Sequence, residues 1–243
     1  MLLPQQAKLM SNLADLAAEC SEMPLLSHTH GQPATPTTMG RELGVFLHRL
    51  QLAMARLQAV VIRGKLSGAV GNFAAHHVAC PEVEWQPLAQ GVVERMGLEY
   101  VPIATQIECH DWMAEYAFAL VSLNTILLDA SRDMWQYVSR GYFKQAVKPG
   151  EVGSSTMPHK VNPIYFENAE GNLGIANSLL QHLATKLPVS RMQRDLSDST
   201  VLRSWGTALG HCSIAYAQFM EGVSRVQPNQ EAMQVRESEL PAL

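Results

Sequence analysis

The sequence lacks features that mark several classes of protein. Its four cysteines, Cys20, Cys80, Cys109 and Cys212, are scattered, with no CxxC and no close pair. This spacing predicts neither a disulfide framework nor a zinc site, and it is typical of the reducing cytoplasm. The net charge is −4, and no run of Lys or Arg reaches the density that nucleic-acid binding uses. We therefore expect a cytoplasmic protein without a nucleic-acid partner.

Long apolar runs are also missing. No run approaches the roughly 20 residues that a membrane helix needs. The first residues, MLLPQQAKLM, lack the basic flank of a signal peptide. These absences predict that no membrane is a partner. The 243 residues are nevertheless 47% hydrophobic, which is enough for a sizeable core.

Apolar residues recur in steps of three and four along most of the chain, as they do on one face of a helix. Glycine and proline cluster between these stretches, and β-type alternation is absent apart from a possible short hairpin near 65–73. The pattern predicts an all-α fold, a bundle of long helices in a single domain over residues 1–243. The expected helices cover residues 6–19, 41–62, 86–96, 111–138, 166–187 and 205–223.

The stretch 111–138 is apolar on more than one face. Phe118, Val121, Ile126 and Leu128 lie off its main stripe. A helix that is apolar on several faces is buried on several sides, which favours subunits that pack together through the bundle. The alternative is a monomer with one thick core.

One loop gathers several chemically useful side chains. Residues 150–167, GEVGSSTMPHKVNPIYFE, hold two glycines, two adjacent serines, Lys160 and Asn162, with Glu167 directly behind them. The glycines let the backbone move or approach a ligand closely. The alternative is an ordinary connection between helices with a serine-rich cap.

Three other segments carry candidate site residues. The first, SHTHGQPATPTTM (27–39), presents His30 from a proline-rich loop; metal binding by His28 and His30 is an alternative, but no third ligand of usual spacing is near. In the second, KLPVSRMQRDLSDSTVLR (186–203), arginine forks and hydroxyls suit a phosphate or a carboxylate. Its arginines could instead pair with Asp195 and Asp198. The third, TQIECHD (105–111), offers Gln106 and His110, or simply a helix cap.

Together these segments resemble the fumarase/aspartase superfamily of lyases. GSSTMPHKVNP (153–163) resembles its signature loop, and THGQPATPTT with QRDLSDSTVLR resembles the adenylosuccinate lyase branch, especially the bacterial form. The resemblance covers nearly everything from about Pro24 to Val226. It implies a helical bundle that forms a homotetramer with active sites shared between subunits. It implies no metal and no organic cofactor.

The activity implied is release of fumarate from succinyl-adenosine monophosphate, and from the succinylated carboxamide ribotide SAICAR, in purine biosynthesis. The resemblance makes Ser154 the base that takes a carbon-bound proton. It makes Lys160 and Asn162 the groups that hold the aci-carboxylate. His30 becomes the acid that protonates the departing nitrogen, and Glu167 orients and charges it. The implied substrate-binding residues are Thr29 for the succinyl end, Arg194, Ser199 and Arg203 for the phosphate end, and Gln106, Ser155 and Met157.

The chain also departs from that family. It begins within what would be the first helix of the central domain, so we expect the N-terminal and C-terminal domains to be absent. Residues 230–243 diverge, and Ser67 and Ala74 stand where the bacterial form would have asparagines. Two alternatives follow: another fumarate-releasing lyase or cycloisomerase of the superfamily, or a non-catalytic truncated assembly domain that has kept lyase loops.

Overall fold

The computed structural model describes residues 2–146, 157 and 160–234. Their contacts gather in two compact units. Unit 1 comprises Met1–Ala53, Leu123–Ala176 and Leu209–Leu243, and unit 2 comprises Met54–Ser122 and Asn177–Ala208. A single domain over residues 1–243 stays a prediction.

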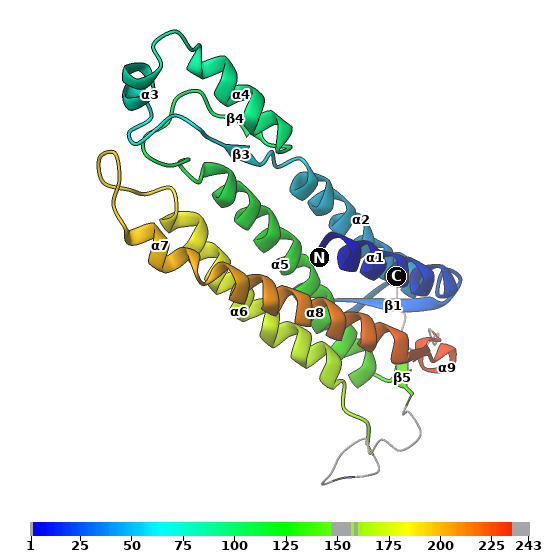
Figure 1. The fold of residues 1–243 in the computed structure, drawn as a ribbon. Coiled ribbons are helices and arrows are strands. Elements are labelled where there is room, and N and C mark those ends of the chain that lie inside the picture. The colour runs from blue at the N-terminus through cyan, green and yellow to red at the C-terminus, as the bar shows by residue number, and fades with distance from the viewer. Residues whose placement is uncertain (1, 147–156, 158–159, 235–243) are drawn as a thin grey trace. The chain divides into compact units, whose positions relative to one another are not determined.

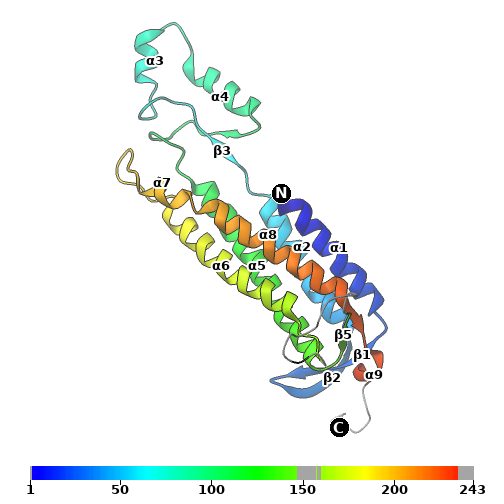
Figure 2. The same ribbon diagram turned by 60° about the horizontal axis from the view of Figure 1, so that its bottom comes forward.

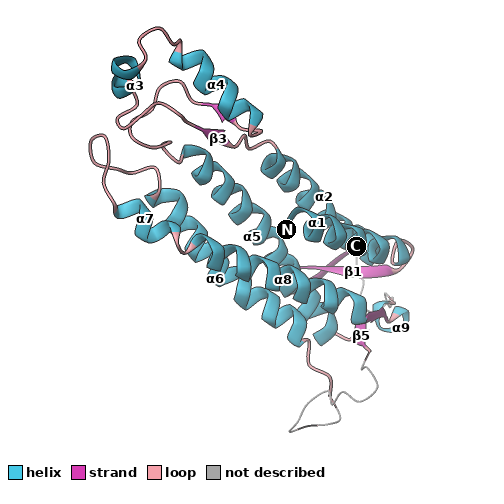
Figure 3. Ribbon diagram, viewed as in Figure 1, coloured by secondary structure: helices cyan, strands magenta, loops and turns pink. Residues whose placement is uncertain are grey.

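The predicted all-α class is confirmed, since helices dominate the described residues and the strands are short (Figure 3). Each expected helix is present, with its ends shifted by a few residues. The helices are α1 (Leu2–Glu19), α2 (Met39–Gln58), α3 (Ala74–Ala79), α4 (Trp85–Arg95), α5 (Asp111–Ser139), α6 (Ile164–Lys186), α7 (Ser197–Leu202), α8 (Trp205–Arg225) and α9 (Gln230–Met233). The strands are β1 (Pro24–Thr29), β2 (Gln32–Thr38), β3 (Arg63–Gly64), β4 (Glu99–Tyr100), β5 (Phe143–Gln145) and β6 (Val226–Pro228).

Unit 1 is a bundle in which α1 lies beside α8, and segments of α2, α5 and α6 complete the packing (Figures 1 and 2). A buried polar network joins three of these helices. Gln6 Nε2 donates to Tyr216 Oη (3.2 Å), and Tyr216 Oη donates to Asn124 Oδ1 (2.6 Å). Between α6 and α8, the rings of Phe166 and Phe219 meet edge to face at 5.7 Å. Apolar stripes and hydrogen-bonded polar groups therefore hold these helix faces against one another.

The predicted stripes are the buried faces of the long helices. On α6, the residues of the predicted stripe are all buried: Phe166, Ala169, Leu173, Ala176, Leu180 and Leu183. Phe118 on α5 is 50% exposed, so part of the apolar surface off the main stripe is not covered by the described residues. The sequence contains no apolar run as long as a membrane helix needs. By length and composition, however, α5 is the one helix among the described residues that could cross a membrane. Core helices of soluble proteins pass the same test, and six residues of its stripe, from Ala117 to Met134, are buried.

The hairpin expected near 65–73 was placed wrongly. Residues 65–73 form turns, and the two-residue strand β3 before them pairs in parallel with β4. The hairpin that the structure contains is β1–β2, which pairs Pro24 with Thr38 and Thr29 with Gln32 around a bulge after Leu26. Prolines are tolerated there because each strand of a two-stranded ladder has an open edge. A second antiparallel pair joins β5 to β6.

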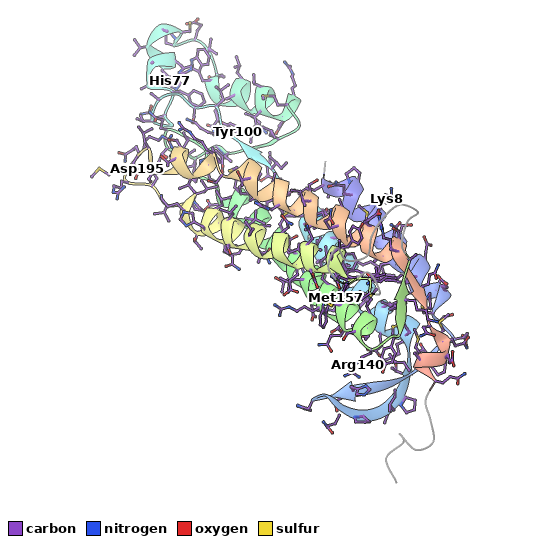
Figure 4. The ribbon with its side chains drawn as sticks, turned by 90° about the horizontal axis from the view of Figure 1, so that it is seen from below. Lys8, His77, Tyr100, Arg140, Met157 and Asp195 are labelled. Carbon is purple, nitrogen blue, oxygen red and sulfur yellow. The ribbon has the colours of Figure 1, made fainter. Side chains whose placement is uncertain are left out.

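Unit 2 consists of α3, α4, α7, the two-residue ladder and the adjoining ends of longer helices. Figure 4 labels three of its residues, His77, Tyr100 and Asp195. Aromatic and ionic contacts hold it together. The rings of His76 and Trp85 meet edge to face at 4.9 Å. Arg63 pairs with Glu99 (3.1 Å) and Glu115 (3.6 Å), which ties β3 to β4 and to the start of α5.

Candidate active site

His30 lies at the tip of the β1–β2 hairpin. Thr29 and Gln32 pair, so His30 and Gly31 form a two-residue loop, with φ of 53° and 74°. Two positive φ values define a type I′ turn, which favours Asn-Gly and accepts histidine less readily. Thr29 and His30 are both exposed. The imidazole is therefore presented outward on a rigid turn, free to meet a ligand or another subunit.

The signature loop is described only in part, because Ser154 and Ser155 lie outside the described residues. Met157 is 43% exposed, and its carbonyl accepts a hydrogen bond from the Lys160 amide at 3.2 Å (Figure 4). Lys160 is exposed and Asn162 is partly buried. Gln145 Nε2 donates to the Val161 carbonyl at 2.9 Å, which anchors the end of the loop to β5.

Glu167 lies in the first turn of α6 and faces α5. Its Oε1 accepts a hydrogen bond from Trp135 Nε1 at 2.9 Å. The two side chains line an open cavity of about 410 Å³ with Arg132, Gln136, Glu170 and Gly171. Among the described residues, no hydrogen bond or ion pair joins Glu167 to His30. No sequence pattern indicated the contact with Trp135, since it depends on how two distant helices face each other.

Arg194 forms an ion pair in unit 2. Arg194 Nη1 donates to Asp198 Oδ2 at 2.6 Å, and His110 Nε2 lies 3.4 Å from the same oxygen. The Asp198 side chain is only 6% exposed and the Arg194 side chain 22%. Burial pushes the pKa of Asp198 upward, but the hydrogen bonds from Arg194 and His110 outweigh it, so the pKa is lowered. The pairing of arginines with Asp195 and Asp198, considered above as an alternative, is thus observed in this structure.

The other expected phosphate-binding residues lie on or beside α7. Ser199 Oγ donates to the Leu196 carbonyl at 3.0 Å. Arg203 is exposed, and its side chain has no hydrogen-bond or ionic partner among the described residues. Arg203 is consequently the more available of the two expected phosphate-binding arginines, because the charge of Arg194 is already balanced.

Gln106 lies on a loop that contacts the loop bearing Arg194. The Gln106 amide donates to the Gln193 carbonyl at 3.3 Å, next to Arg194 in sequence. Two expected substrate-binding segments thus adjoin within unit 2. Lys65 also contacts the Gln106 loop, which was not expected from the sequence. Its Nζ lies within hydrogen-bond distance of the Gln106 carbonyl, and burial lowers the pKa of Lys65.

A second cavity, of about 180 Å³, lies at the base of the hairpin. None of the expected site residues lines it; its lining includes His28, Glu42, Asp133 and Arg140. Arg140 is labelled in Figure 4. Burial, together with the charges of Asp129 and Glu42, raises the pKa of Asp133. Neither here nor elsewhere in the described part of the chain do three His, Cys, Asp or Glu side chains cluster to hold a metal ion.

Comparison with protein families places these residues in a known context. A family model described as "Lyase" matches residues 1–176, and one described as "Adenylosuccinate lyase C-terminal" matches residues 190–240. The chain therefore belongs to the fumarase/aspartase superfamily of lyases. The second match runs into residues 230–240, and both the divergence of residues 230–243 and the absence of further domains stay predictions.

Within that superfamily, the similar curated proteins are adenylosuccinate lyases. The chain is 50% identical to that of Haemophilus influenzae over 229 residues, which are 94% of this chain and 50% of the relative. It is 50% identical to that of Escherichia coli K12 over 230 residues (95% and 50%) and 51% identical to that of Legionella pneumophila strain Corby over 231 residues (95% and 51%). The chain spans about half the length of the curated relatives it matches.

Proposed function

We propose that this chain carries part of the active site of a cytoplasmic adenylosuccinate lyase. The reaction is a β-elimination that breaks the carbon–nitrogen bond of adenylosuccinate and releases fumarate and AMP; SAICAR is the second substrate. The observation that carries the proposal is the identity of about 50% to adenylosuccinate lyases across nearly the entire chain. The contact between the Gln106 and Arg194 loops supports a shared binding surface for one ligand.

The proposed chemistry assigns one role to each loop. Ser154 takes the proton from the carbon next to the one that bears the departing nitrogen, and the electrons move into the carboxylate attached to the deprotonated carbon as the aci-form. Lys160 and Asn162 stabilise that charge as it develops. The electrons then form the carbon–carbon double bond while the carbon–nitrogen bond breaks. His30 gives its proton to the departing nitrogen.

The remaining assignments concern binding. Arg203 meets the phosphate with its free guanidinium, and Ser199 and Arg194 contribute from the same segment. Thr29 serves the succinyl end, next to His30 on the exposed turn. Gln106, Ser155 and Met157 complete the set. No metal or organic cofactor has a role in this mechanism.

Because Glu167 bonds to Trp135 and no contact joins it to His30 within the chain, we assign its orienting role to a site shared between subunits of a homotetramer. Uncovered apolar side chains on the long helices, such as Phe118 on α5, support assembly through the bundle. In this arrangement the turn of one subunit meets α6 of another.

Fumarate release, followed by ultraviolet absorbance with adenylosuccinate as substrate, tests the function. We expect turnover by the chain together with a tetrameric mass in a sizing measurement. Ser154→Ala is expected to abolish turnover and keep the tetramer, whereas Ser155→Ala is expected mainly to raise KM. Near-normal turnover by Ser154→Ala would refute its role as base. Assembly of the unmodified chain without turnover would instead favour the non-catalytic assembly domain.

Replacement of both Arg194 and Arg203 separates the nucleotide assignment from other lyases of the superfamily. Their substrates lack the nucleotide phosphate, so only a nucleotide lyase needs these cations. We expect the double variant to bind adenylosuccinate much more weakly in a calorimetric titration. Unchanged binding would overturn the nucleotide assignment.

A further inference from the structure

Lys65 joins two loops of unit 2 through its ammonium group. Its Nζ donates to the carbonyls of Gly68 (2.9 Å), Thr105 (3.1 Å) and Gln106 (2.6 Å). An ammonium has three N–H donors, so all of them are used. The carbonyls belong to the turn that follows β3 and to the loop that precedes α5. One side chain thus fixes the separation of two segments about 40 residues apart.

Two further contacts hold the same loop. Gly71, with φ of 83°, lies so close that an added Cβ would be 1.9 Å from the Ala104 carbonyl oxygen. In addition, the Gln106 backbone amide donates a hydrogen bond to the Gln193 carbonyl. The backbone at residues 104–106 is therefore fixed by a cation, a close glycine contact and a hydrogen bond.

The Gln106 side chain itself is exposed, and no hydrogen bond to its amide group is present among the described residues. Its direction is consequently set by the backbone that carries it. We propose that Lys65 is a positioning residue for Gln106, holding that side chain where it meets the substrate beside the Arg194 segment. The inference rests on the proposed function, because that function makes Gln106 a substrate-binding residue.

The first test needs no catalysis. Lys65→Met removes all three donors, and Lys65→Gln keeps two N–H donors on a shorter side chain. Hydrogen exchange of the Gln106 amide, followed by NMR, should accelerate by about tenfold in the Met variant, because charge-assisted hydrogen bonds are lost. The Gln variant should lie between it and the unmodified chain. Lys8→Met, which changes an exposed lysine on α1, is the matched control and should leave this exchange unchanged.

The second test separates positioning from a merely structural role. For the Met variant, KM for adenylosuccinate should rise by about tenfold while kcat stays within about twofold, since Lys65 touches no reacting atom. Gln106→Ala should reproduce the rise in KM without faster exchange at the neighbouring amides. If the Met variant does not fold, which circular dichroism will reveal, the Gln variant decides both readouts.

Several outcomes contradict the proposal. Unchanged exchange at Gln106 in both Lys65 variants overturns it. Faster exchange at Gln106 in the Lys65 variants, combined with an unchanged KM, also overturns it, provided that Gln106→Ala does raise KM. If Gln106→Ala also leaves KM unchanged, the substrate-binding role of Gln106 is wrong and the inference fails with it. The catalytic assignment would then still depend on Ser154 and fumarate release alone.

Discussion

His30 lies on an exposed turn, whereas Arg194 lies in a largely buried ion pair, although both are assigned to one active site. Among the described residues, His30 has no side-chain hydrogen bond or ion pair, so its replacement is expected to leave the packing intact. Arg194 balances Asp198, so its removal leaves a buried carboxylate without its cation. A variant of the hairpin that loses activity therefore gives direct evidence about catalysis. For a variant of Arg194 or its neighbours in unit 2, loss of activity must first be separated from loss of stability.

The variant His30→Asn tests the hairpin side of this comparison most directly. Asparagine is favoured where His30 stands in the type I′ turn, so the hairpin keeps its shape. Fumarate release should fall by about 10²–10⁴-fold, as for loss of a general acid, while the urea midpoint stays the same or rises slightly. His28→Asn on the same hairpin is the control and should keep activity; if it loses as much as His30→Asn, the assignment of the acid is wrong.

The buried pair is probed by Asp198→Ala. We expect a loss of about 2 kcal/mol in the free energy of unfolding, because Arg194 is left largely buried without its counter-ion. Arg191→Ala breaks a pair of the same i,i+4 spacing in the same segment, but Arg191 is 83% exposed. The measured change should be much smaller there, since exposed ion pairs contribute little. Equal losses from the two variants, measured by urea unfolding, would show that burial does not distinguish the pairs.

The pH dependence of stability gives a smaller effect of known sign. The folded state lowers the pKa of Asp198, so its ionised form contributes stability above the ordinary pKa of about 3.9. That contribution is lost as the pH falls through the lower folded-state value. The difference in unfolding free energy between the unmodified chain and Asp198→Asn should therefore shrink below about pH 4. A difference that stays constant down to acid unfolding would contradict this.

The smallest expected effects concern two buried neutral serines. Ser131 Oγ donates to the Leu127 carbonyl at 2.8 Å, whereas Ser67 Oγ has no hydrogen-bond partner among the described residues, and both residues are 1% exposed. Ser131→Ala should cost about 1 kcal/mol, and Ser67→Ala should be neutral or stabilise by up to about 1 kcal/mol. Thermal unfolding checks both. A larger loss at Ser67 than at Ser131 would show that the Ser67 hydroxyl has a partner after all.

The long helices could be predicted from the sequence because their burial follows a local period. The stripe on α5 needed only the spacing of residues such as Leu120 and Leu127. The β1–β2 hairpin could not be predicted, since Pro33 and Pro36 do not show strand alternation and only Leu25 and Leu26 are buried in β1.

For the candidate site, too, local features could be predicted and long-range contacts could not. Which side chains carry chemistry was evident from the sequence and the family resemblance. The partners of those side chains were not, apart from the possibility that arginines pair with Asp195 and Asp198. The contacts of Glu167 with Trp135 and of Lys65 with the Gln106 loop join residues 32 and 41 positions apart, which no local pattern encodes.

The prolines of the hairpin have one more consequence. Pro24, Pro33 and Pro36 carry no amide hydrogen, so an approaching extended chain would find an incomplete row of donors along the ladder. The β1–β2 hairpin can therefore be exposed to solvent with a lower tendency to pair with other strands or to start fibres. Side chains, the imidazole at its tip among them, are therefore the main groups that a docking neighbour would contact.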